Sequence, residues 1–257
     1  MRERLVLGST ALLLPLVLWE VIPRIVTLPR GVQLFLATPS QIAVALGRLV
    51  ASGELQQHFT VSATEFLIGL GLSIVVGLPL GVLFGRVAWL DDLVDPFVTA
   101  LNATPRIVWL PLLILWFGLG IWSKVLIVFL GAVFPLLVNT YEGVRNADRV
   151  LVNVVRSFGG SSWQVARIVV LPGALPYVVA GLRLAIGRAV LGVVVGEFFG
   201  ASRGLGYMIA SAASSYRPDV MFAGVLVLMA LSLVLTFSVQ AVEARLTRWR
   251  PEAAKTF

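Results

Sequence analysis

Long apolar blocks alternate with short polar connections along almost the whole chain. The hydrocarbon core of a bilayer is about 30 Å thick, and a helix crosses it with roughly 20 apolar residues. We therefore predict an all-α membrane protein with one transmembrane domain over residues 1–257. Its six membrane-spanning helices are expected at about residues 5–26, 59–84, 107–119, 124–138, 177–199 and 220–242.

The polar segment at about residues 141–176 differs from the blocks on either side of it. In its first half, apolar residues recur at helical spacing up to Phe158, and Gly159-Gly160-Ser161-Ser162 then breaks the helix. A second helical piece follows, and the prolines at 172 and 176 are expected to end it. This order predicts an amphipathic helical hairpin exposed at one membrane face. The alternative is an amphipathic loop lying on the lipid surface.

The spacing of a glycine and a Leu-Pro pair in this segment resembles the cytoplasmic coupling loop of permease subunits in ABC importers. That family's pattern is Glu-Ala-Ala, three residues, Gly, nine residues, then Ile, any residue and Leu-Pro. Here Gly159, Val169 and Leu171-Pro172 stand at the required spacings, and Asn153-Val154-Val155 takes the place of Glu-Ala-Ala. The resemblance covers about residues 38–245 and points to the nitrate, sulfonate and taurine type of permease. It extends through Pro105, Pro111, Trp116-Phe117-Gly118, Gly181-Leu182-Arg183 and Gly196-Glu197.

The resemblance implies a fold and a set of partners. The fold is that of type I ABC importer permeases, with a cytoplasmic coupling-helix hairpin. Two ABC ATPase subunits would grip the hairpins of two permease copies, expected to form a homodimer, and a substrate-binding protein would deliver cargo at the outer face. ATP and Mg would lie on the ATPase, with no cofactor on this chain and no nucleic acid as partner. The implied location is the bacterial cell (inner) membrane, with both termini cytoplasmic.

The resemblance also assigns roles to residues of the hairpin. The docking residues that it implies are Asn153, Val154, Val155, Arg156, Phe158, Gly159, Trp163, Val169, Leu171 and Pro172. Gly159 would fix the turn between the two helices, while Val155, Phe158 and Trp163 would fill a groove on the ATPase. Because Asn153 is neutral where the family has a glutamate, Arg156 or Arg149 is the alternative polar anchor.

Composition limits the function classes. Hydrophobic residues make up 58% of the chain, charged residues make up 13%, and the mean hydropathy is +0.95, which excludes an ordinary soluble domain. With no cysteine and one histidine, His58, the chain offers no disulfide and no metal cluster, and His58 is expected at the membrane interface. No Gly-x4-Gly-Lys-[Ser/Thr] phosphate-binding motif is present. The chain is therefore expected not to be an enzyme by itself.

Most of the 20 Lys and Arg residues lie at the ends of the apolar blocks, as the orientation bias of membrane proteins predicts. With the hairpin and both termini inside, eleven of these cations lie on the inner side, six lie outside and three lie within the blocks. This distribution favours an inward-facing hairpin.

Residues within the apolar blocks are candidates for the substrate pathway: Arg106, Trp109, Trp116, Arg183, Arg188 and Glu197. Charges at such depth usually face a cavity or the interior of a helix bundle. The excess of arginine favours an anion such as nitrate, a sulfonate or taurine as cargo. The aromatic residues Trp109, Trp116, Phe198 and Phe199 could instead stack on a flat ring, as in riboflavin, a thiamine pyrimidine precursor or an aromatic acid. For Arg183 and Glu197 the alternative is a structural pair or a contact between two permease copies, and Arg106 could reach the headgroups.

Several smaller features carry structural predictions. Glu65, near the start of the second block, is expected at the membrane interface rather than in the interior. Gly77, Gly81 and Gly85 repeat every four residues, as do Gly192, Gly196 and Gly200, which predicts close packing against neighbouring helices. Thr38-Pro39-Ser40 should begin a short amphipathic helix. Residues 200–218 should form a glycine-rich turn with a short helix.

Two other function classes are weighed against the importer. A secondary transporter needs an inverted repeat with helices broken at matching positions, which the sequence does not show. A passive membrane scaffold has no need of charges inside the fifth apolar block.

Overall fold

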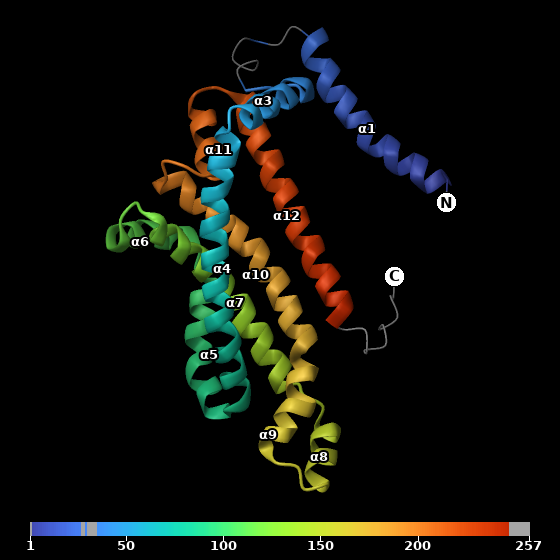
Figure 1. Cartoon of the computed structure of the whole chain (residues 1–257), viewed down its shortest axis with the longest axis vertical. Coiled ribbons are helices and arrows are strands. Elements are labelled where there is room, and N and C mark those ends of the chain that lie inside the picture. The colour runs from blue at the N-terminus through green and yellow to red at the C-terminus, as the bar shows by residue number, and fades with distance from the viewer. Residues whose placement is uncertain (1, 27–28, 30–34, 247–257) are drawn as a thin grey trace. The chain divides into compact units, whose positions relative to one another are not determined.

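The computed structural model describes residues 2–26, 29 and 35–246, apart from the side chains of residues 2–12, 88, 90–92, 94, 95, 106 and 246. Every regular element in this part of the chain is helical (Figure 1). The chain divides into two compact units, Met1–Ser62 with Ala201–Ala230 and Ala63–Gly200 with Leu231–Phe257. Helices α4 (Glu54–Arg86) and α12 (Pro218–Leu246) run from one unit into the other. The single domain expected from the sequence stays a prediction.

The first unit holds α1 (Arg2–Ile25), α3 (Pro39–Ala51) and α11 (Leu205–Ser214) besides the starts of α4 and α12. Thr38 begins α3 because its hydroxyl accepts a hydrogen bond from the Gln41 N–H, while the Gln41 side chain accepts one from the Thr38 N–H at 2.9 Å. Ile42, Ala45 and Leu49 recur at helical spacing and are buried in the core of this unit. The two short helices predicted in these regions are confirmed.

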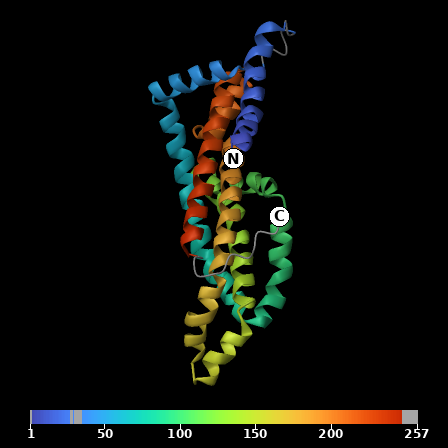
Figure 2. The same cartoon turned by 90° about the vertical axis from the view of Figure 1, so that its right-hand side faces the viewer.

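The second unit carries the long helices and the hairpin. After α4 its elements are α5 (Ala88–Ala103), η1 (Arg106–Trp109), α6 (Leu110–Phe117), α7 (Ile121–Arg145), α8 (Arg149–Ser157), α9 (Ser162–Val165), η2 (Ala166–Val170) and α10 (Leu171–Gly200). Residues 131–137 of α7 are all buried, so α7 is the centre of this unit. Figure 2 shows α7 and α10 side by side, with the hairpin at their far end.

Glycines bring α4 into backbone contact with α7. A Cβ added to any of four α4 glycines would come within 3.1 Å of an α7 side chain. The pairs are Gly69 with Val128, Gly77 with Leu136, Gly81 with Thr140 and Gly85 with Val144. In each pair the α7 residue lies 59 positions after the α4 residue, so the two helices run parallel. Small residues permit this close approach, as the glycine repeat of α4 predicts.

The same kind of contact joins α10 to α7 in the opposite direction. The α7 partners of Gly181, Gly192 and Gly196 are Asn139, Val128 and Lys124, so the partner number falls as the glycine number rises. The two helices are therefore antiparallel. Gly200 lies against α6, where an added Cβ would be 3.1 Å from Ile114 Cδ1. The predicted packing role of the second glycine repeat is confirmed as well.

Four helices of the described chain are long and apolar enough to cross a membrane: Glu54–Arg86, Ile121–Arg145, Ser162–Gly200 and Pro218–Arg245. They contain the predicted spans at 59–84, 124–138, 177–199 and 220–242. The helices exceed these blocks because turns of polar residues continue each helix past its apolar part. The first predicted span, at 5–26, coincides with α1, and a total of six spans stays a prediction.

The segment predicted as a span at 107–119 is not a straight membrane-crossing helix, and its place among six spans stays a prediction. Its α-helical part, α6, has 8 residues and is about 12 Å long, far short of a hydrocarbon core of about 30 Å. Ile107–Phe117 bends by 86° from Pro96–Ala103, so the two segments make at most one broken span. Pro105 causes the break because the residue before a proline avoids the helical region, and Thr104 accordingly has ψ 127°. The segment before it, predicted as a connection, is helix α5.

The prolines at 172 and 176 do not end the second arm of the hairpin, and this expectation is wrong too. Helical structure continues for 39 residues from Ser162 to Gly200 through α9, η2 and α10. In the π-helical turn η2, the Leu171 N–H donates to the Ala166 carbonyl five residues back. This wider turn directly precedes Pro172 and accommodates its missing N–H and its ring. The second arm is therefore continuous with α10.

The close α4–α7 contact predicts that one methyl group added at Gly81 lowers the stability of the chain. In Gly81→Ala, the new Cβ would lie 2.6 Å from Thr140 Cβ and 2.7 Å from the Leu137 carbonyl oxygen. We expect the free energy of unfolding to fall by about 1–3 kcal/mol, as in other overpacked interfaces. The measurement is thermal unfolding of the full chain in detergent.

Gly71→Ala is the matched control in the same helix, because no atom lies within 4 Å of a Cβ added there. Helix propensity alone should raise its stability by up to about 1 kcal/mol. Equal unfolding temperatures for the two variants would contradict the contact.

Candidate functional site

The hairpin, defined here as residues 148–171, projects from the ends of α7 and α10 in both views (Figures 1 and 2). Its first helix, α8, begins at Asp148, whose Oδ1 accepts hydrogen bonds from the Val150 N–H at 2.8 Å and the Leu151 N–H at 3.4 Å. Such a cap satisfies N–H groups that have no partner within the helix. The start of α8 is thus fixed by local chemistry, without help from the rest of the unit.

Two glycines with different tasks form the turn. The Gly159 N–H donates to the Arg156 carbonyl and the Gly160 N–H donates to the Val155 carbonyl, both at 2.9 Å, which closes the end of α8 in a Schellman motif. Gly159 has φ +79°, which other residues adopt only with strain. At Gly160, an added Cβ would lie 2.5 Å from Val155 Cγ1. The break at Gly159-Gly160 was predicted, whereas the lack of space for a side chain at Gly160 was not.

Ser161 begins the second arm. Its N–H donates to the Gln164 side chain at 2.7 Å, and its hydroxyl accepts from the Gln164 N–H at 3.3 Å. This reciprocal capping box fixes where α9 starts. The two arms are therefore held at a defined turn by backbone and capping hydrogen bonds.

Large apolar side chains are exposed on the hairpin. Phe158 is 88% exposed, Val150 69% and Trp163 65%, and no residue of α8 is buried. Large apolar side chains gathered on one exposed segment favour an interaction site. The hairpin therefore has the character of a docking surface.

The remaining docking residues expected from the sequence divide into two groups. Asn153, Val154, Arg156, Gly159, Leu171 and Pro172 are exposed, as is the alternative anchor Arg149. Val169 is buried, and Val155 is half-buried against Gly160. Val155 and Val169 therefore support the hairpin from within.

The candidate pathway residues do not come together in one place. Arg183 pairs with Glu243 of α12, whereas Arg188 donates to Asn102 Oδ1 of α5 at 2.8 Å. Glu197 is buried and is not the partner of Arg183. Of Arg106 only the backbone belongs to the described part of the chain.

Trp109 and Trp116 share a hollow of about 350 Å³ in the second unit. Its other lining residues are also apolar: Leu101, Leu113, Phe117, Leu126, Phe129, Leu130 and Phe134. With no polar group to fix an orientation, this hollow suits hydrocarbon better than a charged solute. It gives an anion no partner.

Glu65 is buried, at 2% exposure, and its expected place at the membrane interface is wrong. Helix α4 begins at Glu54, five residues before the apolar block, so Glu65 lies three turns inside the helix. Its neighbours are Lys124 of α7 and Glu197 of α10. The alternative weighed for such a carboxylate, that it faces protein, is the one observed.

Two α4 side chains in the first unit hold the start of α11. His58 Nδ1 accepts a hydrogen bond from the Gly204 N–H at 3.0 Å, and Ser62 Oγ accepts one from the Leu205 N–H at 2.8 Å. His58 thus has a structural task, and its side chain is only 12% exposed. No group of three His, Cys, Asp or Glu side chains that would fit a metal ion occurs among the described residues.

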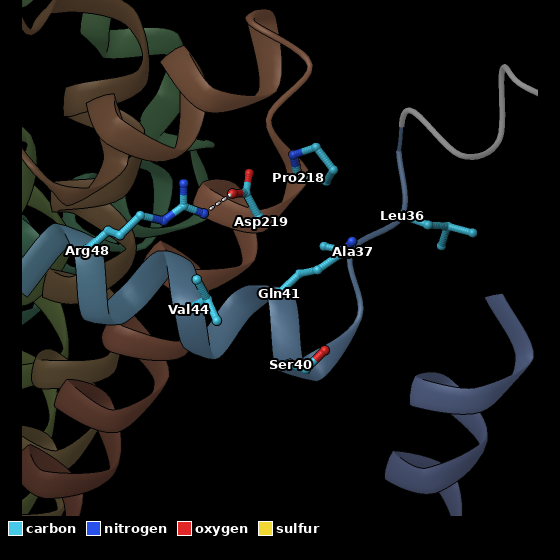
Figure 3. Close-up of a pocket in the computed structure, with 8 residues that line it drawn as sticks. All are labelled: Leu36, Ala37, Ser40, Gln41, Val44, Arg48, Pro218 and Asp219. Atoms are coloured by element: carbon cyan, nitrogen blue, oxygen red, sulfur yellow. Dashed lines mark hydrogen bonds and ion pairs between the residues drawn. The ribbon is translucent and has the colours of Figure 1, made fainter. Parts of the chain in front are cut away.

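The first unit also contains a hollow of about 410 Å³ beside α3, lined by Leu36, Ala37, Ser40, Gln41, Val44, Arg48, Pro218 and Asp219 (Figure 3). In its wall, Arg48 and Asp219 form an ion pair at 3.4 Å. Because the two charges compensate each other, this hollow offers no net attraction for an anion.

Known proteins resemble this chain in sequence and in fold. A family model described as "Binding-protein-dependent transport system inner membrane component" matches residues 73–248. The taurine transport system permease protein of Escherichia coli (strain K12) is 32% identical over 251 residues, which cover 96% of this chain and 90% of that protein. A Bacillus subtilis (strain 168) permease protein assigned to aliphatic sulfonates transport is 37% identical over 246 residues, 93% of this chain and 87% of that protein.

A solved structure of the MetNI methionine ABC transporter in an inward-facing conformation gives a TM-score of 0.67, covering 76% of this chain and 96% of that chain. At 22% sequence identity this likeness shows the fold alone.

The packing around the turn predicts that there is no room for a side chain at Gly160. In Gly160→Ala, the methyl group would meet Val155 Cγ1 at 2.5 Å and the Val155 carbonyl oxygen at 2.7 Å. We expect the Schellman turn to be weakened by about 1–3 kcal/mol. Faster hydrogen exchange of the α8 and α9 amides should report this.

Gly173→Ala is the control, since a Cβ at Gly173 meets no atom within 4 Å. It should leave exchange in the hairpin unchanged. Wild-type exchange in Gly160→Ala would argue against the turn as described.

Proposed function

The chain belongs to the family of binding-protein-dependent transport system inner membrane components and is the permease subunit of an ABC importer, and we propose that its hairpin is the surface through which the ATPase drives it. ATP hydrolysis belongs to separate ATPase subunits, so the chain is a transport subunit and not an enzyme. The observation that carries the proposal is the exposure of the large aromatic side chains of Phe158 and Trp163 on the hairpin.

Burial of these side chains would stabilise a complex. Each Å² of apolar surface removed from water contributes about 25 cal/mol, and a fully buried Phe or Trp side chain contributes roughly 1.5–3 kcal/mol. Aromatic side chains at the centre of an interface commonly dominate its binding energy. Arg149, Arg156 and Arg167, all exposed around this surface, would then contact polar or acidic groups at the rim of the partner's groove.

The continuity of the second arm supports a mechanical role. Because α9, η2 and α10 form one helix from Ser162 to Gly200, a displacement of the hairpin carries directly into α10. α10 packs antiparallel on α7, so both helices would move together. Closure of the ATPase dimer on ATP binding would thus rock the helices as rigid bodies and expose the pathway to alternate sides.

The assembly we propose has two ATPase subunits that bind ATP and Mg, and two permease copies, with one hairpin for each ATPase. A substrate-binding protein meets the opposite face of the membrane. Each permease copy has six spans, with α1 and the bent pair of α5 and α6 completing the four long helices. Both termini and the hairpin lie inside, as the distribution of Lys and Arg supports.

For cargo we propose an anion of the sulfonate or taurine class. The relatives named for taurine and aliphatic sulfonates transport support this class. Arg188 supports it as well: it is half-buried, its hydrogen-bond partner Asn102 is a neutral amide, and no ion pair compensates its charge among the side chains that the structure describes. Arg183 is a weaker candidate because Glu243 already compensates its charge. The flat-ring alternative would use the hollow beside Trp109 and Trp116, which has no polar group to orient a ligand.

Removal of an exposed aromatic ring from the hairpin tests docking. We expect Phe158→Ala and Trp163→Ala each to weaken binding of the ATPase subunit by tenfold or more, corresponding to at least about 1.4 kcal/mol. Binding is measured with the purified full-length permease in detergent. The unfolding temperature should change little, because both side chains are mostly exposed.

Phe97→Ala is the control for this experiment: Phe97 is 66% exposed but lies on α5, outside the hairpin. It should bind the ATPase like the wild type. Unchanged ATPase binding in both hairpin variants, or labelling of the hairpin from the outer side of the membrane, would refute the docking model.

Charge removal at Arg188 tests the cargo proposal. In liposomes that contain the complete transporter and its binding protein, Arg188→Gln should lower taurine or alkanesulfonate uptake at least tenfold, whereas Arg188→Lys should retain most of it. The reason is that a partly desolvated cation stabilises an anion in the pathway. Equal uptake by both variants, or riboflavin uptake without sulfonate uptake, would contradict the proposal without affecting the docking model.

A further inference from the structure

Three ionisable side chains meet inside the second unit. Glu65 of α4, Lys124 of α7 and Glu197 of α10 are only 2%, 4% and 1% exposed. They come from the three helices that the glycine contacts hold together. None of them belongs to the hairpin, and none is used in the transport mechanism above.

Lys124 is tied to the α6–α7 turn as well as to the carboxyl groups. Its Nζ donates to the Leu119 carbonyl and, at 3.1 Å, to the Gly120 carbonyl. The ammonium group is therefore well supplied with acceptors and keeps its charge. One positive charge then faces two acidic side chains.

Charge balance argues against two ionised carboxylates here. An uncompensated charge in a buried, membrane-embedded site costs several kcal/mol, and an acid in this position avoids the cost by binding a proton. With one proton on the pair of acids, the three side chains carry no net charge.

The packing of the helices and one buried oxygen identify the member that holds this proton. The register of α4 on α7 places Glu65 beside Lys124, 59 positions later, and a Cβ added at Gly196, next to Glu197, would lie 3.1 Å from Lys124 Cγ. Glu65 Oε2 is buried without a hydrogen-bond partner. An unpaired oxygen costs less on a neutral carboxyl than on a carboxylate, which makes Glu65 the protonated member.

We propose that Glu65 and Glu197 form a buried one-proton site, in which the Glu65 carboxyl group holds the proton and Lys124 balances the Glu197 carboxylate. The proton is resident and keeps the junction of α4, α7 and α10 neutral. The site also connects this junction to the turn that follows α6, through the carbonyls that bind Lys124. A metal ion would need more oxygen ligands than these two side chains supply.

Infrared spectroscopy of the full chain in lipid detects the site directly, through the C=O stretch of a buried protonated carboxyl group. We expect this band in the wild type and its loss in Glu65→Gln. Glu197→Gln should lose the band too, because Glu65 then gives up its proton to pair with Lys124. Lys124→Met should give about twice the wild-type intensity, since both acids would then be neutral.

Glu54→Gln is the matched control, an exposed glutamate at the start of the same helix, and it should keep the band. If Lys124→Met does not fold, the two glutamine variants still decide the question. A wild-type protein without the band, or a band that survives Glu65→Gln, would overturn the proposal. So would a band-free protein whose unfolding temperature rises with NaCl but not with KCl, because a sodium ion would then occupy the site.

Discussion

Backbone contact at glycine holds the long helices of the second unit together. Lipid tails are as apolar as leucine, so helices in a membrane gain little from hiding apolar side chains from the solvent. Their association depends on close van der Waals contact, which requires the absence of a Cβ at Gly77, Gly81, Gly192 and Gly196. Each of these positions faces α7, and α7 is accordingly the helix that the other two enclose. If α4 or α10 slid along α7, a larger residue would replace a glycine at the contact and its Cβ would collide with α7.

This fixed register explains why polar side chains can be buried in so apolar a bundle. Ser73 donates to the Gly69 carbonyl within α4 and to the Phe129 carbonyl of α7, at 2.8 and 3.1 Å. Such bonds form only if the helices stay at one separation and one register. Glu65, Lys124 and Glu197 depend on the same precision, because a shift of one residue would separate these three side chains. The glycine contacts therefore determine where charge can be placed inside the unit.

Apolar blocks and glycine spacing predicted four long helices and the faces on which two of them pack, because both features act locally and repeat along the helix. A break before the block at 107–119 follows from Pro105, but the size of the bend, 86°, does not, because the block has the composition of a span. At Pro172 the sequence predicted the end of a helix that in fact continues, because the π-helical turn before this proline makes room for its ring. The burial of Glu65 depended on α4 beginning at Glu54, which a hydrophobic pattern does not mark. At the hairpin, the Gly159 turn and the exposed aromatic residues were predictable, whereas the steric demand at Gly160 follows only from the position of Val155.

The hairpin is joined unequally to its two neighbours, and this asymmetry gives a direction to any force applied to it. Between α7 and α8 the chain leaves the helix at Asn146 and re-enters at Arg149, so this joint can bend. Between α9 and α10 the helix is continuous from Ser162 to Gly200, so this joint is the stiffer of the two. A push on Trp163 therefore travels along α10 rather than α7. Because α10 contacts α7 at Gly143, Gly181, Gly192 and Gly196, the two helices respond as one body from the hairpin to the charged junction at Glu197.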